Sequence, residues 1–135
     1  MSLEPFYSLI LKETIRLAVL EDIGHGDITS FLTISDSKKA KANIIGKEDF
    51  VLAGMPFVKE VFTAIDPDIK IKIFFKEGSY IKKGDIIAEI NGRAKGILAG
   101  ERIALNILQR ISGIATVTRG YANKLKGLPA KIADT

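Results

Sequence analysis

A stripe of polar side chains on an otherwise apolar helix is the part of this sequence best suited to chemistry. Within residues 97–111, Arg102, Asn106 and either Gln109 or Arg110 follow one another at helical spacing and share one narrow face. A helix this apolar is expected in a core or in a subunit interface, where an arginine needs an anionic partner. Its fork suits a carboxylate or a phosphate, so Arg102 is a candidate anion-binding residue. The alternative is that Arg102 pairs with an internal acid such as Glu101 or caps a carbonyl.

A turn-rich segment, DIGHGDITS at residues 22–30, carries the other candidates. His25 lies between two glycines and is either a turn residue or a general base or anion contact. We favour the turn residue, because no acid forms an evident relay with it. Asp22 and Asp27 could be paired catalytic carboxylates, but in a glycine-rich turn the capping of backbone donors is commoner.

The composition excludes several kinds of site. With no cysteine, the 135 residues offer no disulfide, no thiolate nucleophile and no zinc–sulfur site, and one histidine cannot form a histidine metal cluster. The 20 basic residues are dispersed among 16 acidic ones, without the basic stripe typical of nucleic-acid-binding proteins. The apolar runs are too short to span a bilayer, and the amino-terminal residues lack the pattern of a signal peptide. We therefore expect a cytoplasmic protein that binds neither nucleic acid nor membrane.

The spacing of apolar residues predicts an α+β fold. Helices are expected over residues 5–21, 55–65, 95–112 and 114–126, and strands over 39–49, 69–75, 85–91 and 130–135. The clearest strand contains Ile69, Ile71 and Ile73 in alternation with lysines. Gly78 and Gly84 are expected in turns. This order of elements indicates antiparallel strands with helices packed on one side.

Four segments together resemble one enzyme family, the quinolinate phosphoribosyltransferases. They are EDIGHGDITS (21–30), GKEDFVLAGMP (46–56), EGSYIKKGDIIAEINGRAKGILAGERIALNILQRISGIAT (77–116) and KIADT (131–135), in the family's order and spacing. The resemblance covers nearly the whole chain, and EDIGHGDITS and ERIALNILQRISGIAT are its most specific parts. It implies the amino-terminal α/β sandwich domain of a type II phosphoribosyltransferase over residues 1–112. A linking helix and the first strand of an α/β barrel would follow over 113–135, so we expect a chain truncated before the barrel.

The resemblance also implies a function. Enzymes of the family transfer phosphoribosyl from phosphoribosyl pyrophosphate to quinolinate with Mg²⁺ present, and they form nicotinic acid mononucleotide, pyrophosphate and carbon dioxide in NAD biosynthesis. They are homodimers or larger assemblies with shared active sites. Arg102 matches the arginine that reaches into the partner's site and holds a quinolinate carboxylate, and Thr135 matches the threonine of the family's DTRKT motif. No catalytic residue or metal ligand is assigned within the chain. The Mg²⁺ ligands are expected beyond residue 135, and the isolated chain is expected to be inactive.

Three other functions share part of the pattern. The segment EGSYIKKGDIIAEI is similar to the hairpin of a biotinyl or lipoyl carrier module, in which Lys95 would be the modified residue. Such a carrier would be all-β, whereas this sequence predicts at least three helices. A phosphoribosyltransferase of different specificity would share the architecture and differ mainly beyond residue 135. A pure interaction or assembly domain is the third alternative.

Overall fold

The computed structural model describes residues 4–24 and 33–133, and within the first range the side chains of residues 9–22. The elements follow the chain in the order α1 (Glu4–Gly24), β1 (Lys39–Ile45), β2 (Phe50–Val51), α3 (Met55–Ile65), β3 (Lys70–Ile73), β4 (Tyr80–Ile81), β5 (Ile86–Arg93) and α4 (Ala94–Lys124). The strands form one sheet with the order β1-β5-β3 and a second, two-stranded sheet of β2 and β4.

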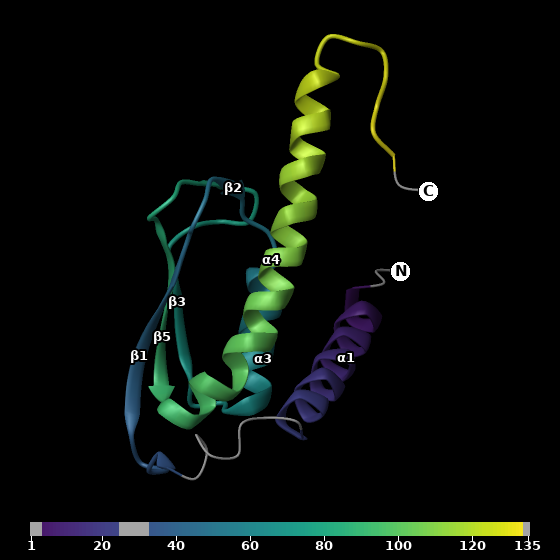
Figure 1. Cartoon of the computed structure of the whole chain (residues 1–135). Helices are drawn as coiled ribbons and strands as arrows, with labels where there is room; N and C mark the ends of the chain where they lie inside the picture. The colour runs from purple at the N-terminus through teal and green to yellow at the C-terminus, as the bar shows by residue number, and fades with distance from the viewer. Residues whose placement is uncertain (1–3, 25–32, 134–135) are drawn as a thin grey trace.

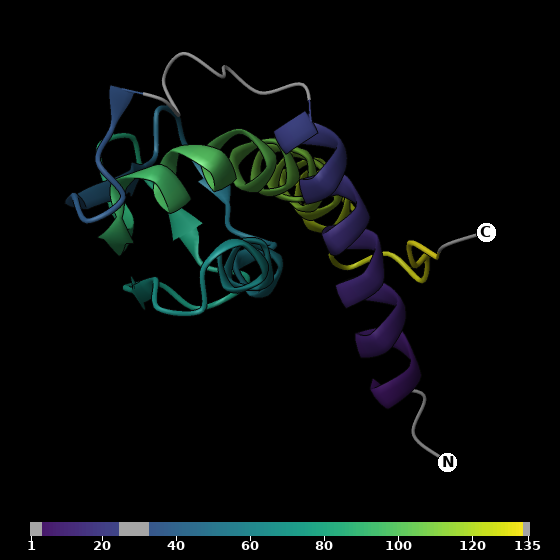
Figure 2. The same ribbon diagram turned by 90° about the horizontal axis from the view of Figure 1, so that it is seen from below.

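The larger sheet is antiparallel and has one apolar face. Its register aligns Ala42, Ile90 and Ile71 across the three strands, while the neighbouring positions carry lysine, asparagine and glutamate. Successive residues of a strand point to opposite faces, so the apolar side chains gather on one side of the sheet. Helices α3 and α4 cover that side, and α1 packs on the far side of these two helices (Figure 1, Figure 2). The predicted α+β sandwich is confirmed.

The core lies between the sheet and the two helices that cover it. From α3 it contains Val58, Val61 and Phe62, each at most 2% exposed, and β5 adds Ile87 and Ile90. On the outer side of α3 and α4, α1 adds its own buried side chains to the same cluster. Burial of these apolar side chains is the main source of stability for a domain of this size.

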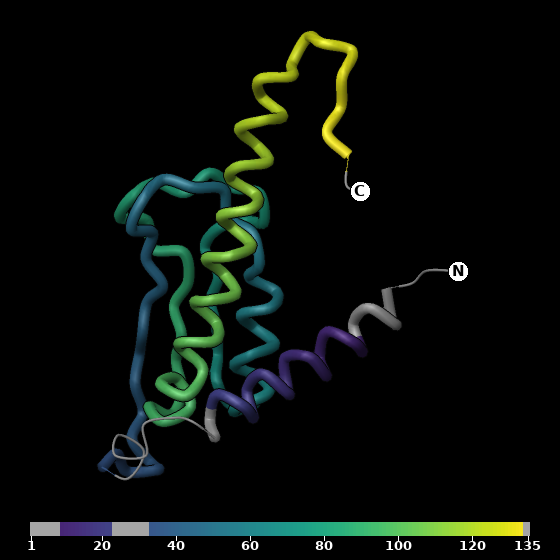
Figure 3. Tube along the Cα trace, turned by 45° about the vertical axis from the view of Figure 1, so that its right-hand side comes forward, coloured from purple at the N-terminus to yellow at the C-terminus, as the bar shows by residue number. Residues whose placement is uncertain are grey.

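α4 is one continuous helix of 31 residues, from Ala94 to Lys124. The prediction of two helices divided near Gly113 is therefore wrong. A glycine within a helix costs about 1 kcal/mol relative to alanine but does not end the helix. Here Ser112 and Thr116 bind the β2 segment from either side of Gly113, which stabilises the helix across this position. The last turns of α4 extend beyond the sheets and α3 (Figure 1, Figure 3).

The other element boundaries agree in part with the sequence-based expectations. The bounds of α3 match the predicted range 55–65, and Gly78 and Gly84 have φ values of 80° and 96°, as their predicted turns require. β1 and β3 are shorter than predicted and β5 extends to Arg93. The predicted strand over 130–135 is wrong for residues 130–133, which lie outside any strand. A strand needs a hydrogen-bonded neighbour, which a short apolar pattern does not itself provide.

Candidate functional site

The orientation of α4 is set by a buried face near its start. The buried apolar side chains of α4 are at most 8% exposed. Gly100 allows such a close approach to α3 that an added Cβ would lie 2.7 Å from Cε1 of Phe62. This packing turns the opposite face outward, so the predicted stripe of Arg102, Asn106 and Gln109 is exposed. Of its two predicted locations, core and subunit interface, the core is therefore wrong.

Arg102 contacts Asp22, which lies 80 residues earlier in the sequence and in the last turn of α1. Its Nε donates a hydrogen bond to Oδ1 of Asp22 at 2.9 Å, and its Nη2 contacts the same oxygen. The Arg102 side chain is 62% exposed and that of Asp22 is 25% exposed. An internal acid was one predicted partner of Arg102, but that acid is Asp22 rather than Glu101. Asp22 itself was expected in a turn, whereas the structure places it in a helix and opposite a guanidinium.

Three residues with predicted roles lie in parts of the chain that the structure does not describe. His25 and Asp27 of the turn-rich segment, and Thr135 of the partial DTRKT motif, lie outside the described residues. Their predicted roles stay predictions. Arg102 and Asp22 are thus the sequence-derived candidates that the structure brings together.

The start of α4 is held by an ion pair with a buried carboxylate, which sequence reasoning missed. Arg93, the residue before α4, donates from Nε and Nη2 to the two carboxylate oxygens of Asp66 at 2.7 and 2.8 Å. Asp66 is 4% exposed and also accepts a hydrogen bond from the backbone N–H of Asp68. The Arg93 hydrogen bond is the largest effect that lowers the pKa of Asp66. This pair joins the end of α3 to the start of α4.

Lys95, the residue on which the carrier-module alternative depends, lies in the first turn of α4. Its Nζ is 2.6 Å from Oδ1 of Asp36, and its side chain is 21% exposed. This hydrogen bond is the main cause of a lowered pKa at Asp36. A carrier module presents its lysine at a tight turn between strands, so the structure contradicts that alternative.

Two hydroxyl groups of α4 bind the backbone around β2, and sequence reasoning missed them as well. Ser112 Oγ accepts a hydrogen bond from the N–H of Ala53 and donates one to the carbonyl of the same residue. One turn further, Thr116 Oγ1 accepts a hydrogen bond from the N–H of Val51. The signal in the sequence was the spacing of these two hydroxyl residues, four apart within the family-like segment ISGIAT. Together they fix the middle of α4 to the smaller sheet.

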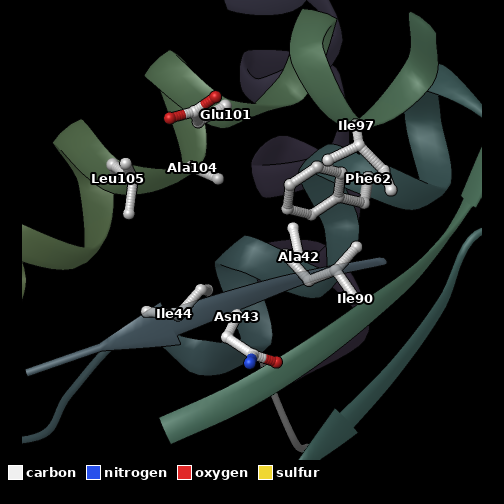
Figure 4. A pocket seen from close by; sticks show the side chains of 9 residues that line it. All are labelled: Ala42, Asn43, Ile44, Phe62, Ile90, Ile97, Glu101, Ala104 and Leu105. Carbon is white, nitrogen blue, oxygen red and sulfur yellow. The ribbon is translucent and has the colours of Figure 1, made fainter. Parts of the chain in front are cut away.

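A cavity of about 130 Å³ lies between α4 and the apolar face of the larger sheet (Figure 4). Its lining is mainly aliphatic and aromatic, with Asn43 and Glu101 as the polar members. Pockets for small-molecule substrates usually enclose roughly 300–1,000 Å³. The cavity is small and lined by no basic side chain, so it does not suit an anionic substrate.

The described residues show no metal site. In residues 4–24 and 33–133, no group of three or more histidine, cysteine, aspartate or glutamate side chains could hold a metal ion. The Mg²⁺ ligands that the family resemblance implies are expected beyond residue 135, and that expectation stays a prediction. Within the same part of the chain, no helix has the length and apolar character needed to cross a membrane.

Comparison with known proteins identifies the family. Residues 27–112 match the family described as "Quinolinate phosphoribosyl transferase, N-terminal domain". The chain belongs to this family. It is 40% identical over 127 residues to the "Probable nicotinate-nucleotide pyrophosphorylase [carboxylating]" of Bacillus subtilis, and 40% identical over 126 residues to a chloroplastic nicotinate-nucleotide pyrophosphorylase of Oryza sativa. These matches cover 94% and 93% of this chain but 44% and 33% of the two relatives.

Solved structures show the same fold. The crystal structure of NadC from Streptococcus pyogenes matches with a TM-score of 0.87 at 33% identity, and it covers 94% of this chain and 46% of that one. The nicotinate-nucleotide pyrophosphorylase from Francisella tularensis matches with a TM-score of 0.84 at 32% identity, over 93% of this chain and 45% of that one. The predicted family and fold are confirmed, and the chain spans less than half the length of these proteins. The domain division at residue 112 stays a prediction, and α4 crosses it without a break.

Proposed function

We propose that this chain is the amino-terminal part of an enzyme that transfers phosphoribosyl from phosphoribosyl pyrophosphate to quinolinate. The products would be nicotinic acid mononucleotide, pyrophosphate and carbon dioxide. The observation that carries the proposal is the 40% identity over 94% of the chain to a protein named as a probable carboxylating nicotinate-nucleotide pyrophosphorylase. Relatives at 36% identity are named quinolinate phosphoribosyltransferases.

The chemistry requires cationic groups that hold and orient quinolinate. The ring nitrogen forms a bond to the ribose carbon while the bond from that carbon to pyrophosphate breaks. As carbon dioxide leaves, the electron pair of its bond stays on the ring carbon beside the quaternised nitrogen, whose positive charge stabilises it, and that carbon then takes up a proton. Quinolinate carries two carboxylates, and holding one of them fixes the ring for attack. We assign this role to Arg102, since a guanidinium can bind a carboxylate through two parallel hydrogen bonds.

The exposure of Arg102 supports a site that is shared between subunits. Arg102 lies on the outward face of α4 and does not line the cavity beneath that helix. On the same helix Ile114, Val117 and Tyr121 are 58–61% exposed and follow at spacings of three and four residues. A row of large exposed apolar side chains is typical of a surface covered by protein. We therefore propose a homodimer, or a larger assembly, in which Arg102 reaches the active site of a neighbouring subunit.

The remaining parts of the proposal concern the rest of the enzyme. We expect Thr135 to lie at the edge of the quinolinate pocket and the Mg²⁺ ligands to lie beyond residue 135. We also expect the enzyme to act in the cytoplasm. Because this chain covers 44% of the Bacillus subtilis relative, the isolated 135 residues should show no transferase activity. Measurable turnover of quinolinate by residues 1–135 alone would contradict that expectation.

The proposal is tested by steady-state kinetics on the complete gene product, with quinolinate and phosphoribosyl pyrophosphate varied separately. Arg102→Ala should raise the KM for quinolinate, because loss of a desolvated charge-assisted pair costs about 2–4 kcal/mol, or about 30- to 700-fold. Arg16→Ala is the matched control, because Arg16 pairs with Glu13 on an exposed face of α1. Unchanged quinolinate kinetics in Arg102→Ala would refute the assigned role. Turnover of nicotinate in place of quinolinate would instead favour an enzyme of different specificity.

A further inference from the structure

The two sequence segments that are most specific to the family meet at one contact. Asp22 belongs to EDIGHGDITS and Arg102 to ERIALNILQRISGIAT, and their side chains form a hydrogen-bonded ion pair. We propose that Asp22 is a positioning residue for Arg102. It holds the Nε and Nη2 edge of the guanidinium and thereby presents the remaining N–H groups to a carboxylate of quinolinate. This inference rests on the function proposed above.

The geometry of the pair differs from that of the structural pair in the same chain. Arg93 donates to both oxygens of Asp66. Each of the two donors on this edge of the guanidinium therefore has its own carboxylate oxygen. Arg102 instead directs Nε and Nη2 to a single oxygen, Oδ1 of Asp22. The other N–H groups of Arg102 make no hydrogen bond to any residue in the described ranges. They are available to a second anion, and a guanidinium has enough donors to bind two carboxylates at once.

Asp22 is itself held on a helix that packs against the core. Ile15 and Val19 of α1 are 3% and 5% exposed and belong to the core cluster. Asp22 follows them at spacings of seven and three residues, so it lies on the same face of α1. The end of α1 that carries Asp22 lies beside the first half of α4, while the helix diverges from α4 toward its own amino-terminal end (Figure 1, Figure 3). The packing of α1 thus determines where the carboxylate stands.

The exposure of the pair indicates a role in orientation more than in folding. Arg102 is 62% exposed, and ion pairs between such exposed side chains contribute little to folding stability. A free arginine side chain samples many rotamers and must be ordered when it binds a ligand. Asp22 orders it in advance, which removes part of that entropic loss at the moment of binding.

Two possible effects of Asp22 on quinolinate binding have opposite signs, so removal of Asp22 distinguishes them. If Asp22 positions Arg102, its removal weakens quinolinate binding. If Asp22 only competes with the ligand for the guanidinium, its removal strengthens binding. We expect Asp22→Ala to raise the KM for quinolinate about three- to tenfold, as for the loss of one pre-ordered side chain. The kcat and the KM for phosphoribosyl pyrophosphate should stay unchanged.

The experiment is a double-mutant cycle in the complete gene product. It compares Asp22→Ala, Arg102→Ala and the double variant, with Glu13→Ala as the control for loss of a carboxylate from α1. Asp22→Ala should add no further increase in quinolinate KM once Arg102 is absent. Asp22→Asn, which keeps an acceptor oxygen, should recover part of the loss. Thermal unfolding of Asp22→Ala should shift no more than that of the control.

The possible outcomes test the positioning role of Asp22 and the assigned role of Arg102 separately. An unchanged or lowered quinolinate KM in Asp22→Ala overturns the positioning role. An equal increase in the presence and absence of Arg102 overturns it too, because the effect would not pass through the guanidinium. If Arg102→Ala itself leaves the quinolinate KM unchanged, the assignment of Arg102 under the proposed function has failed, and the role of Asp22 fails with it. If Arg102→Ala raises the KM and Asp22→Ala does not, the positioning role alone has failed.

Discussion

The ion pair between Asp66 and Arg93 predicts how this domain responds to acid. Replacement of Asp66 by asparagine keeps the volume and one acceptor oxygen but removes the charge. Asp66 is 4% exposed and accepts two hydrogen bonds from Arg93 and one from the backbone of Asp68. The asparagine amide group would face one of the guanidinium donors, so at least one charge-assisted hydrogen bond is lost. Such bonds contribute about 1.5–3 kcal/mol. Because the Arg93 side chain is 51% exposed, we expect a loss of about 1–2 kcal/mol at neutral pH.

The dependence on pH follows from the direction of the pKa shift. The pKa of Asp66 is lowered in the folded state, chiefly by the hydrogen bond from Arg93. A carboxyl with a depressed folded-state pKa stabilises the fold above its unfolded pKa, which is about 3.9 for aspartate. That stabilisation disappears as the pH falls through the lowered pKa. The difference in unfolding free energy between the natural chain and Asp66→Asn should therefore be largest near pH 7 and shrink below about pH 4.

The assay is urea unfolding of the chain, followed by circular dichroism at a series of pH values. Asp68→Asn is the matched control, because Asp68 is 86% exposed and its carboxylate lies 3.8 Å from Nη2 of Arg93. That variant should change the unfolding free energy by no more than about 0.5 kcal/mol. A loss in Asp66→Asn that is the same at pH 7 and at pH 3 would show that the charge of Asp66 is not its cause, and the reasoning would be refuted.

Further predictions concern the helices and use the same unfolding measurement. Gly100→Ala should destabilise the fold by about 1–3 kcal/mol, because its Cβ would lie 2.7 Å from Phe62. Gly113→Ala should instead stabilise it by about 0.5–1 kcal/mol, since nothing lies within 4 Å of an added Cβ and alanine favours the helix; destabilisation would contradict this. Glu77→Ala should cost about 1 kcal/mol, because its carboxylate accepts two backbone hydrogen bonds at the start of α3. Lys76→Ala is its control, and equal effects of the two would rule out the capping role.

Local patterns in the sequence predicted the elements whose boundaries are set by local chemistry. Both ends of α3 agree with the prediction, since Pro56 stands in its first turn and Pro67 lies two residues beyond its last residue. The predicted break at Gly113 failed, because the contacts that stabilise α4 there come from a segment about 60 residues earlier in the chain. The spacing of Ser112 and Thr116 indicates that they share a helix face, but it does not identify the segment that this face contacts.

For the candidate site, too, local spacing predicted features of one helix but not contacts with a distant segment. The helical spacing around Arg102 predicted a polar stripe in a core or in a subunit interface, with an arginine that needs an anionic partner. The structure places this stripe on an exposed face of α4, so the core location was wrong. Its partner was not predictable, because Asp22 lies 80 residues away and was expected in a turn. An ion pair between distant segments depends on how the helices pack, and spacing along one helix contains no information about that packing.

Three sets of contacts on α4 together determine where Arg102 stands. The Asp66–Arg93 pair fixes the start of the helix against the end of α3. Gly100 fixes its rotation by close contact with α3, and Ser112 fixes its middle against the backbone near β2. A helix held at its start, along one face and at its middle has little freedom to tilt or rotate. The guanidinium is then the main movable part of this region, and Asp22 is the group placed to restrain it. If Arg102 binds a ligand in a neighbouring subunit's pocket, these contacts fix the position from which its guanidinium reaches that pocket.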